Sequence, residues 1–311
     1  MRILLAAMRS EKGDLRLNLS NHLAKLEDTT SRGCELVLFP EMSLTGSVDP
    51  LTKPERLISL DDSNIAALTA ATKGTGVAAA FGVAEITERG DAFITHVVAS
   101  EGRRIGVQRK RYLGEGEEHF SPGSESDVFD IGGHKIGIAI CAEADFDAPF
   151  DDASNAGAKL VLFPAAPGLY GRRTDDASWK RGFAWWERSS LDDARRHAMR
   201  LGLWIALAGQ AGSTLDEDFP GFAALVSPNG SVIDRLPDWR EGDLIVDVPL
   251  WPHEEVASTR RRFYDVRQRG GLIPSQGEKG FHDQPHAYFR VVPCPLMATT
   301  SRAPRSGFET R

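Results

Sequence analysis

The chain has 311 residues, of which 41% are hydrophobic and 26% are charged, and its formal net charge at pH 7 is −7. Such a composition is typical of a globular protein with one large domain or two small ones. The acidic balance argues against a nucleic acid as the main partner, and no apolar run approaches the roughly 18 residues of a membrane-spanning helix. The three cysteines, Cys34, Cys141 and Cys294, are too few and too scattered for a disulfide framework or a zinc site. We therefore expect a cytoplasmic protein that binds neither nucleic acid nor membranes.

The N-terminal half predicts strands separated by helices. Residues 3–8 are apolar and the sequence then turns charged, which predicts a buried strand, because the run is too short for a signal peptide. Leucines recur at helical spacing between this strand and a second strand at Leu36–Phe39, and Gly33 stands where a helix C-cap is expected. The next predicted elements are a helix around Pro54–Lys73 and strands at Val77–Val83, Phe93–Ala99, Arg104–Gln108, Val128–Ile131 and Lys135–Ile140.

The C-terminal half continues the pattern and then loses it. After Cys141 we predict a short helix, a strand at Lys159–Phe163, a long loop, a helix from about Ala177 to Leu201, and strands at Leu203–Ala208, Phe222–Ser227, Val232–Arg235 and Leu244–Val248. Strands that alternate with helices and then with hairpins indicate a mixed sheet covered by helices, an α/β protein. After about Trp251 a basic helical stretch and a tail rich in Gly, Pro, Ser and His follow. We predict one domain over residues 1–250 and a partly mobile C-terminal extension over residues 251–311.

Two stretches, residues 32–41 and residues 156–165, nearly duplicate each other. Each runs from a glycine at a predicted helix exit through the letters Leu-Val-Leu-Phe-Pro, but the first ends in Glu41 and the second in Ala165. The copies lie too far apart for a solenoid repeat, so we predict two related halves packed sheet to sheet. The asymmetry places one ionisable group, Glu41, where a buried strand stops, and marks it as half of a candidate active site.

The other half of this site is Cys141, which ends the apolar run Ile136–Ile140. A cysteine in such a place is ordinarily a packed core residue, and Glu41 by itself would be a surface carboxylate at a strand end. Lys110, in a basic turn, is equally ordinary when taken alone. Together the three supply what a thiol nucleophile needs, a base for its proton and a cation for the oxyanion that forms. We also expect the amides of the turn after Cys141 to lower the pKa of its thiol.

Three motifs in order resemble the carbon–nitrogen hydrolase family, also called the nitrilase superfamily. They are Leu38-Phe39-Pro40-Glu41, Arg109-Lys110-Arg111-Tyr112-Leu113 and Gly137-Ile138-Ala139-Ile140-Cys141. The likeness continues through Phe120-Ser121-Pro122-Gly123 and Gly221-Phe222 to Pro228-Asn229-Gly230. It implies an amidase-like member with a four-layer α-β-β-α sandwich and internal pseudo-twofold symmetry. It also implies protomers that pair into a homodimer or a larger homo-oligomer.

The resemblance implies a role for each residue of the site. Cys141 would be the nucleophile, Glu41 the general base that later protonates the leaving amine, and Lys110 the oxyanion stabiliser, with the amide of Ala142 as a second donor. Attack would give a thioester, which water activated by Glu41 would hydrolyse to a carboxylic acid. This chemistry requires no metal and no organic cofactor.

The family often carries a second glutamate between the lysine motif and the Phe-x-Pro-Gly segment. The glutamate-rich run of this chain fits in two ways, because counting forward from Leu113 points to Glu117 while counting back from Phe120 falls on Gly116. We assign the role of positioning the base and the substrate to Glu117, and we keep Glu118 as the alternative.

The expected substrate is a small amide. Nitrile-cleaving members usually carry Trp and then Glu after the cysteine, and many amidases carry Tyr or Asp nearby, whereas this chain reads Ala142-Glu143-Ala144-Asp145. Amide hydrolysis is favoured because it uses the shared machinery without the nitrile-specific context. Tyr170 and Arg172, in the loop after the second copy of the duplication, are candidate substrate contacts. Arg172 could pair with a substrate carboxylate, although a solvated loop is the more ordinary setting for an arginine.

Two other functions stay open at this point. The same site could hydrolyse an N-carbamoyl group, which would release carbon dioxide together with ammonia. It could also hydrolyse a nitrile, which turnover of nitriles would reveal. A catalytically silent member could instead serve as a binding or scaffold protein through the C-terminal extension.

Overall fold

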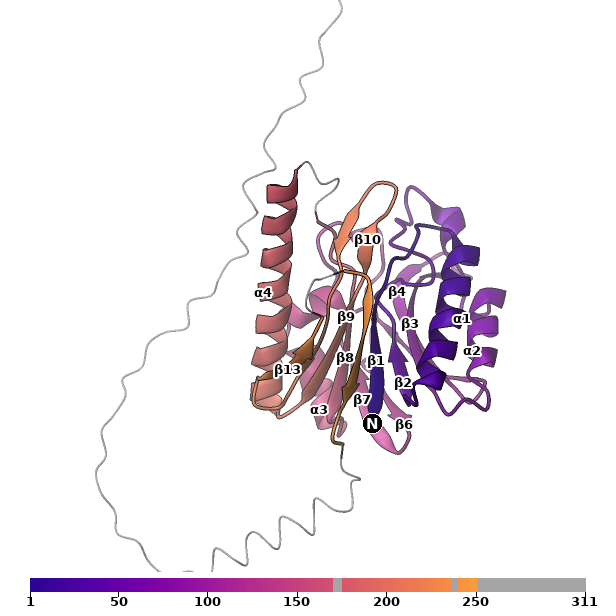
Figure 1. Cartoon of the computed structure of the whole chain (residues 1–311). Helices are drawn as coiled ribbons and strands as arrows, with labels where there is room; N and C mark the ends of the chain where they lie inside the picture. The colour runs from indigo at the N-terminus through magenta and orange to yellow at the C-terminus, as the bar shows by residue number, and fades with distance from the viewer. Residues whose placement is uncertain (170–174, 237–239, 251–311) are drawn as a thin grey trace, which may run out of the picture. The chain divides into compact units, whose positions relative to one another are not determined.

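Two six-stranded sheets form the centre of the molecule (Figure 1). The computed structural model describes residues 1–169, 175–236 and 240–250, which lie in one compact unit, Met1–Arg260. The elements of the first half are β1 (Arg2–Ala7), α1 (Leu15–Ser31), β2 (Leu36–Leu38), η1 (Pro54–Arg56), α2 (Ser63–Ala71), β3 (Ala78–Ile86), β4 (Ala92–Ser100) and β5 (Arg103–Arg109). Those of the second half are β6 (Val128–Ile131), β7 (His134–Ile138), η2 (Cys141–Asp145), α3 (Ala148–Asn155), β8 (Leu160–Ala165), α4 (Asp176–Leu201), β9 (Trp204–Gly209), β10 (Ala211–Ser213), β11 (Asp218–Pro220), β12 (Ala223–Val226), β13 (Val232–Arg235) and β14 (Gly242–Asp247).

The two sheets have the same topology. In the first sheet, β1, β2 and β3 are parallel, β4 and β5 follow antiparallel, and β14 pairs antiparallel with β1. In the second sheet, β7, β8 and β9 are parallel, β12 and β13 follow antiparallel, and β6 pairs antiparallel with β7. The strand β14 therefore completes the first sheet as β6 completes the second. This equivalence confirms the two related halves predicted from the duplicated segments.

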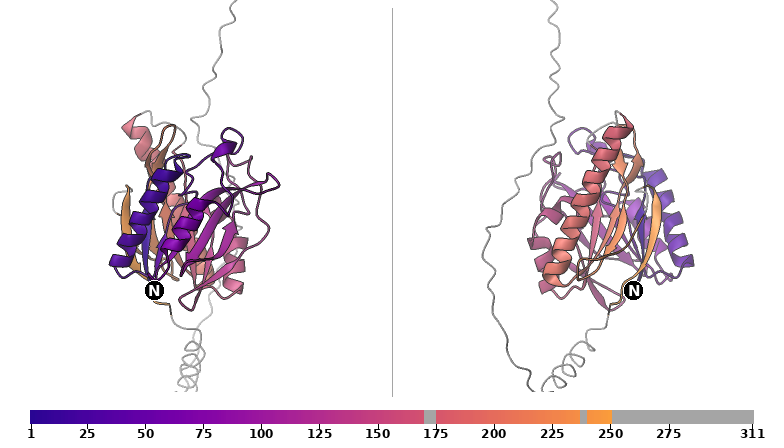
Figure 2. Two further views of the ribbon diagram at one scale, coloured as in Figure 1. Left: turned by 90° about the vertical axis from the view of Figure 1, so that its right-hand side faces the viewer. Right: turned by 60° about the vertical axis from the view of Figure 1, so that its left-hand side comes forward.

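Helices cover the outer face of each sheet, which gives the predicted α-β-β-α order of layers. Figure 2 shows α1 and α2 in front of the first sheet in one view and α4 in front of the second sheet in the other. Between the sheets lies one apolar cluster with members from both, including Leu36 and Leu38 of β2 and Leu160 and Leu162 of β8. Each sheet also packs against its helices through one further apolar cluster. Burial of apolar surface on both faces explains why the central strands read as continuous hydrophobic runs.

The duplicated segments fold alike because their glycines have the same conformation. Gly33 and Gly157 have φ angles of +66° and +92°, in the left-handed region that ends a helix, and they follow α1 and α3. The strands that come next, β2 and β8, each pair in parallel with the preceding strand of their half. The sequence pattern thus positions the ends of β2 and β8 equivalently in the two sheets.

Some predicted elements differ from the observed ones. The helix predicted around Pro54–Lys73 is wrong in its first part, because the short turn η1 precedes an α2 that begins only after Asp62, whose side chain caps it by accepting the amide of Asn64 at 2.7 Å. The strand predicted to reach Ile140 ends at Ile138. The hairpin of β10 and β11 is not predicted from the sequence, since each strand has only 3 residues.

The C-terminal extension, predicted to be partly mobile, lies outside the described residues, and so does the basic stretch within it. Across the described residues, no helix combines the length and the apolar character needed to cross a membrane.

Candidate active site

A buried lysine lies between two glutamates at one end of the sheets. The side chains of Lys110 and Glu41 are 0% and 1% exposed, and Lys110 Nζ donates to Glu41 Oε1 at 2.7 Å. The same Nζ donates to Glu117 Oε1 at 2.6 Å. Buried charges need close partners of opposite sign because their desolvation is costly. Three of the four residues predicted to be catalytic therefore form one hydrogen-bonded cluster.

The fourth, Cys141, lies beside this cluster, close enough for the charges of Glu41 and Lys110 to act on the pKa of its thiol. Cys141 is half-buried and begins the turn η2, and its φ angle is +48°. A residue other than glycine is strained in this left-handed region, and such strained residues cluster at functional sites. The strained turn holds the thiol at the end of the strand, where it faces Glu41.

The cluster is assembled from strand ends of both sheets. Glu41 follows β2 and Lys110 follows β5 in the first sheet, while Cys141 follows β7 in the second. Glu41 Oε2 also accepts the amide of Ala166, directly after β8, at 2.9 Å. The first duplicated segment therefore reaches the site through its carboxylate, and the backbone amide directly after the second segment binds that carboxylate.

The equivalent place in the other half of the fold lacks this chemistry. By the register of β1 with β2 and of β7 with β8, Met8 corresponds to Cys141 and Ala165 to Glu41. A thioether and a methyl group cannot act as nucleophile and base. Of the two topologically equivalent positions, only one therefore carries the thiol and the carboxylate.

Burial changes the proton affinities of the cluster. Burial raises the pKa of Glu41 above its ordinary value, although the charge of Lys110 opposes this. Burial and the charge of Glu41 raise the pKa of Cys141 well above its usual range. Burial alone would lower the pKa of Lys110, but the charges of Glu41, Cys141 and Glu117 raise it. At neutral pH the thiol therefore keeps its proton beside a charged lysine, and Glu41 is placed to accept that proton.

The amides of the turn after Cys141 were expected to lower the pKa of its thiol, but the net shift of that pKa is upward. The amide of Ala166 does act in that direction, but burial of the thiol outweighs it. Activation must therefore come from a base that removes the proton during attack, which is the part that Glu41 can play.

The structure distinguishes the two candidate second glutamates. Glu117 Oε2 accepts the amide of Gly114 at 2.6 Å, while its other oxygen binds Lys110. Glu118 is exposed, and its carboxylate accepts the amide of Gly116 at 2.9 Å. Glu117 thus contacts the cluster, and the hydrogen bonds of Glu118 stay within its own loop.

The turn that carries Glu41 rests directly on β3. A Cβ at Gly82 would lie 2.2 Å from the amide nitrogen of Met42 and 2.9 Å from the carbonyl carbon of Glu41, so only glycine permits this approach. Ser43 Oγ accepts the amide of Gly82 at 3.2 Å and hydrogen-bonds to His22 Nε2 at 2.9 Å. The position of Glu41 is therefore fixed by backbone contact with β3 and by a buried side chain of α1.

The sequence reasoning missed one buried carboxylate beside the site, that of Glu143. Its two oxygens accept the amides of Arg111 and Ile140, each at 2.7 Å. The available signal is its place as the third residue of the turn after an apolar strand, a position from which a glutamate can cap the start of that turn.

Three residues were predicted to contact the substrate: Ala142, Tyr170 and Arg172. Tyr170 and Arg172 lie outside the described residues. Ala142 is half-buried and lies in the first turn of η2, where backbone amides have no partner within the helix. The loop that leads toward residue 170 is attached to α4, since Trp186 Nε1 donates to the carbonyl of Gly168 at 3.1 Å.

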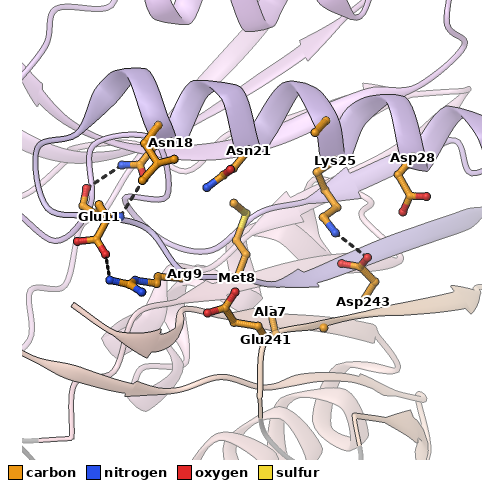
Figure 3. A pocket seen from close by; sticks show the side chains of 13 residues that line it. Ala7, Met8, Arg9, Glu11, Asn18, Asn21, Lys25, Asp28, Glu241 and Asp243 are labelled. Carbon is orange, nitrogen blue, oxygen red and sulfur yellow. Dashed lines mark hydrogen bonds and ion pairs between the residues drawn. The ribbon is translucent and has the colours of Figure 1, made fainter.

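A cavity of about 600 Å³ lies apart from this cluster, between α1 and the start of β14 (Figure 3). None of the four cluster residues lines it. Charged side chains in it pair with each other, Lys25 with Asp243 at 2.6 Å and Arg9 with Glu11. Within the described ranges, no group of His, Cys, Asp and Glu side chains is arranged to hold a metal ion.

Comparison with known families agrees with the geometry of the site. A model of the carbon–nitrogen hydrolase family matches residues 3–260. The chain belongs to the carbon–nitrogen hydrolase family. This confirms the predicted family and the class of enzyme that it names, hydrolases acting on carbon–nitrogen bonds other than peptide bonds.

Several curated relatives are larger proteins. The glutamine-dependent NAD(+) synthetase of Rhodobacter capsulatus is 27% identical over 79% of this chain and 43% of its own length. That of Thermotoga maritima is 30% identical over 46% of this chain and 26% of its own length. The chain thus spans less than half the length of these synthetases.

Solved structures of amidases share the fold of this carbon–nitrogen hydrolase. An amidase from Nesterenkonia sp. has a TM-score of 0.69 and 24% identity, covering 85% of this chain and 96% of the amidase. A variant of the amidase from Nesterenkonia sp. AN1, with acrylamide added to its active-site cysteine, has a TM-score of 0.68 and 22% identity over 85% of this chain and 99% of its own. These likenesses confirm the predicted α/β sandwich.

Proposed function

We propose that this protein hydrolyses the C–N bond of a small amide to a carboxylic acid and ammonia or an amine. The observation that carries the proposal is the position of the Glu41 carboxylate, which is hydrogen-bonded to Lys110 at 2.7 Å and lies near enough to Cys141 for its charge to raise the pKa of that thiol. A nucleophile, a base and a cation gathered at one place are the parts that acyl transfer through a thioester needs. Membership of the carbon–nitrogen hydrolase family supports the same class of reaction.

In the first half of the reaction, Glu41 takes the proton of Cys141 as the sulfur bonds to the amide carbon. The carbonyl oxygen becomes an oxyanion, which the ammonium of Lys110 and the amide of Ala142 stabilise. The C–N bond then breaks, and the proton held by Glu41 passes to the departing nitrogen. The enzyme is left as a thioester of Cys141.

In the second half, water replaces the amine. Glu41, again ionised, takes a proton from the water as its oxygen attacks the thioester carbon. The C–S bond breaks, the carboxylic acid leaves, and the proton returns to the sulfur of Cys141. One amide and one water are consumed in each cycle, and the residues of the site end in their starting protonation states.

Glutamine is the first amide to test. Three of the curated relatives are glutamine-dependent NAD(+) synthetases, and glutamine carries a primary amide that the chemistry above would cleave to glutamate and ammonia. N-carbamoyl compounds and nitriles belong in the same screen, because the thiol could attack either. A protein that turns over none of them would fit the scaffold alternative.

The test is ammonia release combined with intact-mass analysis of the protein. The folded wild-type protein is expected to release ammonia from at least one small aliphatic amide or from glutamine, and to show an added acyl mass on the peptide of Cys141. The variant Cys141→Ala should lose both signals. Cys34→Ala is the matched control, since Cys34 is a buried thiol away from the cluster, and it should keep them.

Two results would contradict the proposal. One is amide turnover that persists in Cys141→Ala, which would place the nucleophile elsewhere. The other is a folded wild-type protein that releases no ammonia from amides, N-carbamoyl compounds or nitriles.

A further inference from the structure

The buried glutamate of the turn η2 connects two segments that belong to different sheets. The side chain of Glu143 is 0% exposed. Its Oε1 accepts the amide of Arg111 and its Oε2 accepts the amide of Ile140, both at 2.7 Å. Arg111 is the residue directly after Lys110, and Ile140 is the residue directly before Cys141. A single carboxylate therefore holds the backbone at both places.

Each of these amides is the first one beyond its sheet. In the first sheet, the amide of Lys110 still donates to the carbonyl of Ile94 at 2.8 Å, and the next amide is that of Arg111. In the second sheet, the amide of Ala139 donates to the carbonyl of Leu162 at 2.9 Å, and the next amide is that of Ile140. Buried amides past the end of a ladder need another acceptor. Glu143 supplies that acceptor to both.

The two hydrogen bonds of Glu143 fix the distance between the segment that carries Lys110 and the segment that carries Cys141, which neither sheet fixes by itself. Lys110 follows β5, the edge strand of the first sheet, while Cys141 follows β7 in the second. The two segments also touch through the rings of Tyr112 and Phe146, which stack with centroids 4.2 Å apart. The stack lies at the outer end of both segments, and Glu143 lies next to the residues that would react.

We propose that Glu143 is a positioning residue, whose carboxylate sets the separation between the Lys110 ammonium and the Cys141 thiol. The inference rests on the proposed amide hydrolysis and adds a residue to its machinery. Glu143 acts through the backbone on either side and needs no contact with substrate. Catalysis is sensitive to such positioning, because a displacement of about 1 Å at the reacting groups can cost about 100-fold in rate.

The chemistry of the contact requires a carboxylate of this length. Both amides are donors, and an ionised glutamate offers an acceptor oxygen to each. A glutamine would accept one amide and turn its own NH₂ donors toward the other. An aspartate keeps the charge but is one methylene shorter, so it cannot reach both amides in the observed arrangement.

The experiment compares Glu143→Gln with Glu85→Gln, which also removes the charge of a buried carboxylate, one that binds the residue before Lys110. Glu85 is 2% exposed, and it binds the side chains of Arg109 and Thr95. Two quantities are measured on folded protein: the rate and pH profile of iodoacetamide alkylation at Cys141, with Cys34 as internal reference, and kcat and KM for an amide that the wild type cleaves. Glu143→Asp is measured in the same way and replaces Glu143→Gln if that variant does not fold.

For Glu143→Gln we expect kcat to fall about 100-fold with KM changed less than about threefold, since positioning acts on the transition state. The alkylation profile of Cys141 should move to higher pH, because the charge of Lys110 lowers the pKa of the thiol and would lie farther from it. Glu85→Gln should leave the alkylation profile of Cys141 in place. A folded Glu143 variant with wild-type kcat and an unmoved alkylation profile overturns the inference, and so does an equal shift in Glu85→Gln.

The alkylation measurement and the kinetic measurement distinguish a failure of this inference from a failure of the proposed function. If the wild type cleaves no amide, the proposed hydrolysis fails, and the alkylation profiles still report whether Glu143 controls the surroundings of Cys141. If the wild type is active and the Glu143 variants match it in both readouts, the positioning role alone fails.

Discussion

Among single residues, Glu117 and Glu118 differ in their hydrogen bonds, so replacement by glutamine should reduce activity strongly at Glu117 and hardly at all at Glu118. Glu117→Gln removes a charge that holds Lys110 at 2.6 Å, so kcat should fall about 100-fold as the lysine shifts. Glu118→Gln changes an exposed carboxylate outside the cluster, and activity should stay within about twofold. Steady-state kinetics of the two variants, side by side, measure this. Equal losses in both, or none in Glu117→Gln, would remove Glu117 from the site.

Most of the site residues could be predicted from the sequence. Glu41, Lys110 and Cys141 each lie within three residues of the end of a strand, and the ends of strands in a packed sandwich converge, so motif and strand pattern were enough to bring them together. Glu117 required a choice between two registers, which only the bond to Lys110 decides. The cap position of Glu143 was visible in the sequence, but its second contact was not, because that contact joins two segments that follow strands of different sheets.

At the scale of elements, the contact between β3 and the turn after Glu41 predicts that Gly82→Ala is costly. The added Cβ would meet the backbone of Met42 at 2.2 Å, and backbone cannot move aside as a flexible side chain can. We expect a loss of about 2 kcal/mol or more in the free energy of unfolding, measured by urea titration, together with reduced amide turnover.

Gly242→Ala is the matched control for this prediction. Gly242 also lies in a strand, β14, and a Cβ there would meet the side chain of Leu236 at an ordinary 3.6 Å. Its free energy of unfolding should stay within about 1 kcal/mol of the wild type. If Gly82→Ala is as stable and as active as Gly242→Ala, the account of how Glu41 is held is wrong.

The elements predicted well are those with strong local signals. Long apolar strands and the glycines that end α1 and α3 are visible in the sequence, since only glycine accepts the left-handed conformation easily. The helix predicted around Pro54–Lys73 was wrong in its first part, because the apolar spacing alone did not show that Asp62 caps its start. The hairpin of β10 and β11 was not predicted, because strands of 3 residues have no periodicity to detect.

At the scale of the whole molecule, three buried histidines predict sensitivity to acid. His22, His96 and His197 are 0% exposed, and burial lowers their pKa values to about 4, about 3 and about 4. In the unfolded chain each binds a proton near pH 6.5. As pH falls from 6.5 toward 4, the unfolded state therefore holds more protons, and the free energy of unfolding decreases. For His22 alone the loss is on the order of 3 kcal/mol. Glu41 and Glu143, whose pKa values are raised, act in the opposite direction.

Urea titrations at pH 7 and pH 5 measure the larger part of this loss, about 2 kcal/mol for His22. The variant His22→Gln removes one titrating group, so its stability should depend less on pH than that of the wild type. His134→Gln, at a half-buried position at the start of β7, is the control and should keep the wild-type slope. A wild-type slope in His22→Gln would mean that His22 does not carry the proton linkage.

The overall architecture could be predicted from the sequence because the two similar segments lie far apart in the chain, one in each half of the fold. Two copies of one strand-exit pattern, residues 32–41 and 156–165, imply two equivalent sheets, and the observed strand orders have that equivalence. The pairing of β14 with β1 could not be predicted, since it joins residues at opposite ends of the described chain, whereas β6 pairs locally with β7. The domain boundary near residue 250 and the assembly into oligomers stay predictions.

If Cys141 and Glu41 act as nucleophile and base, the alkylation rate of Cys141 in the native protein, mapped by mass spectrometry, depends on both residues. We expect Cys141 to react at least about 10-fold faster than the buried Cys34, with a rate that rises as Glu41 loses its proton. This rise should disappear in Glu41→Gln. A Cys141 as slow as Cys34, or an unchanged pH profile in Glu41→Gln, would show that the two residues do not act as nucleophile and base.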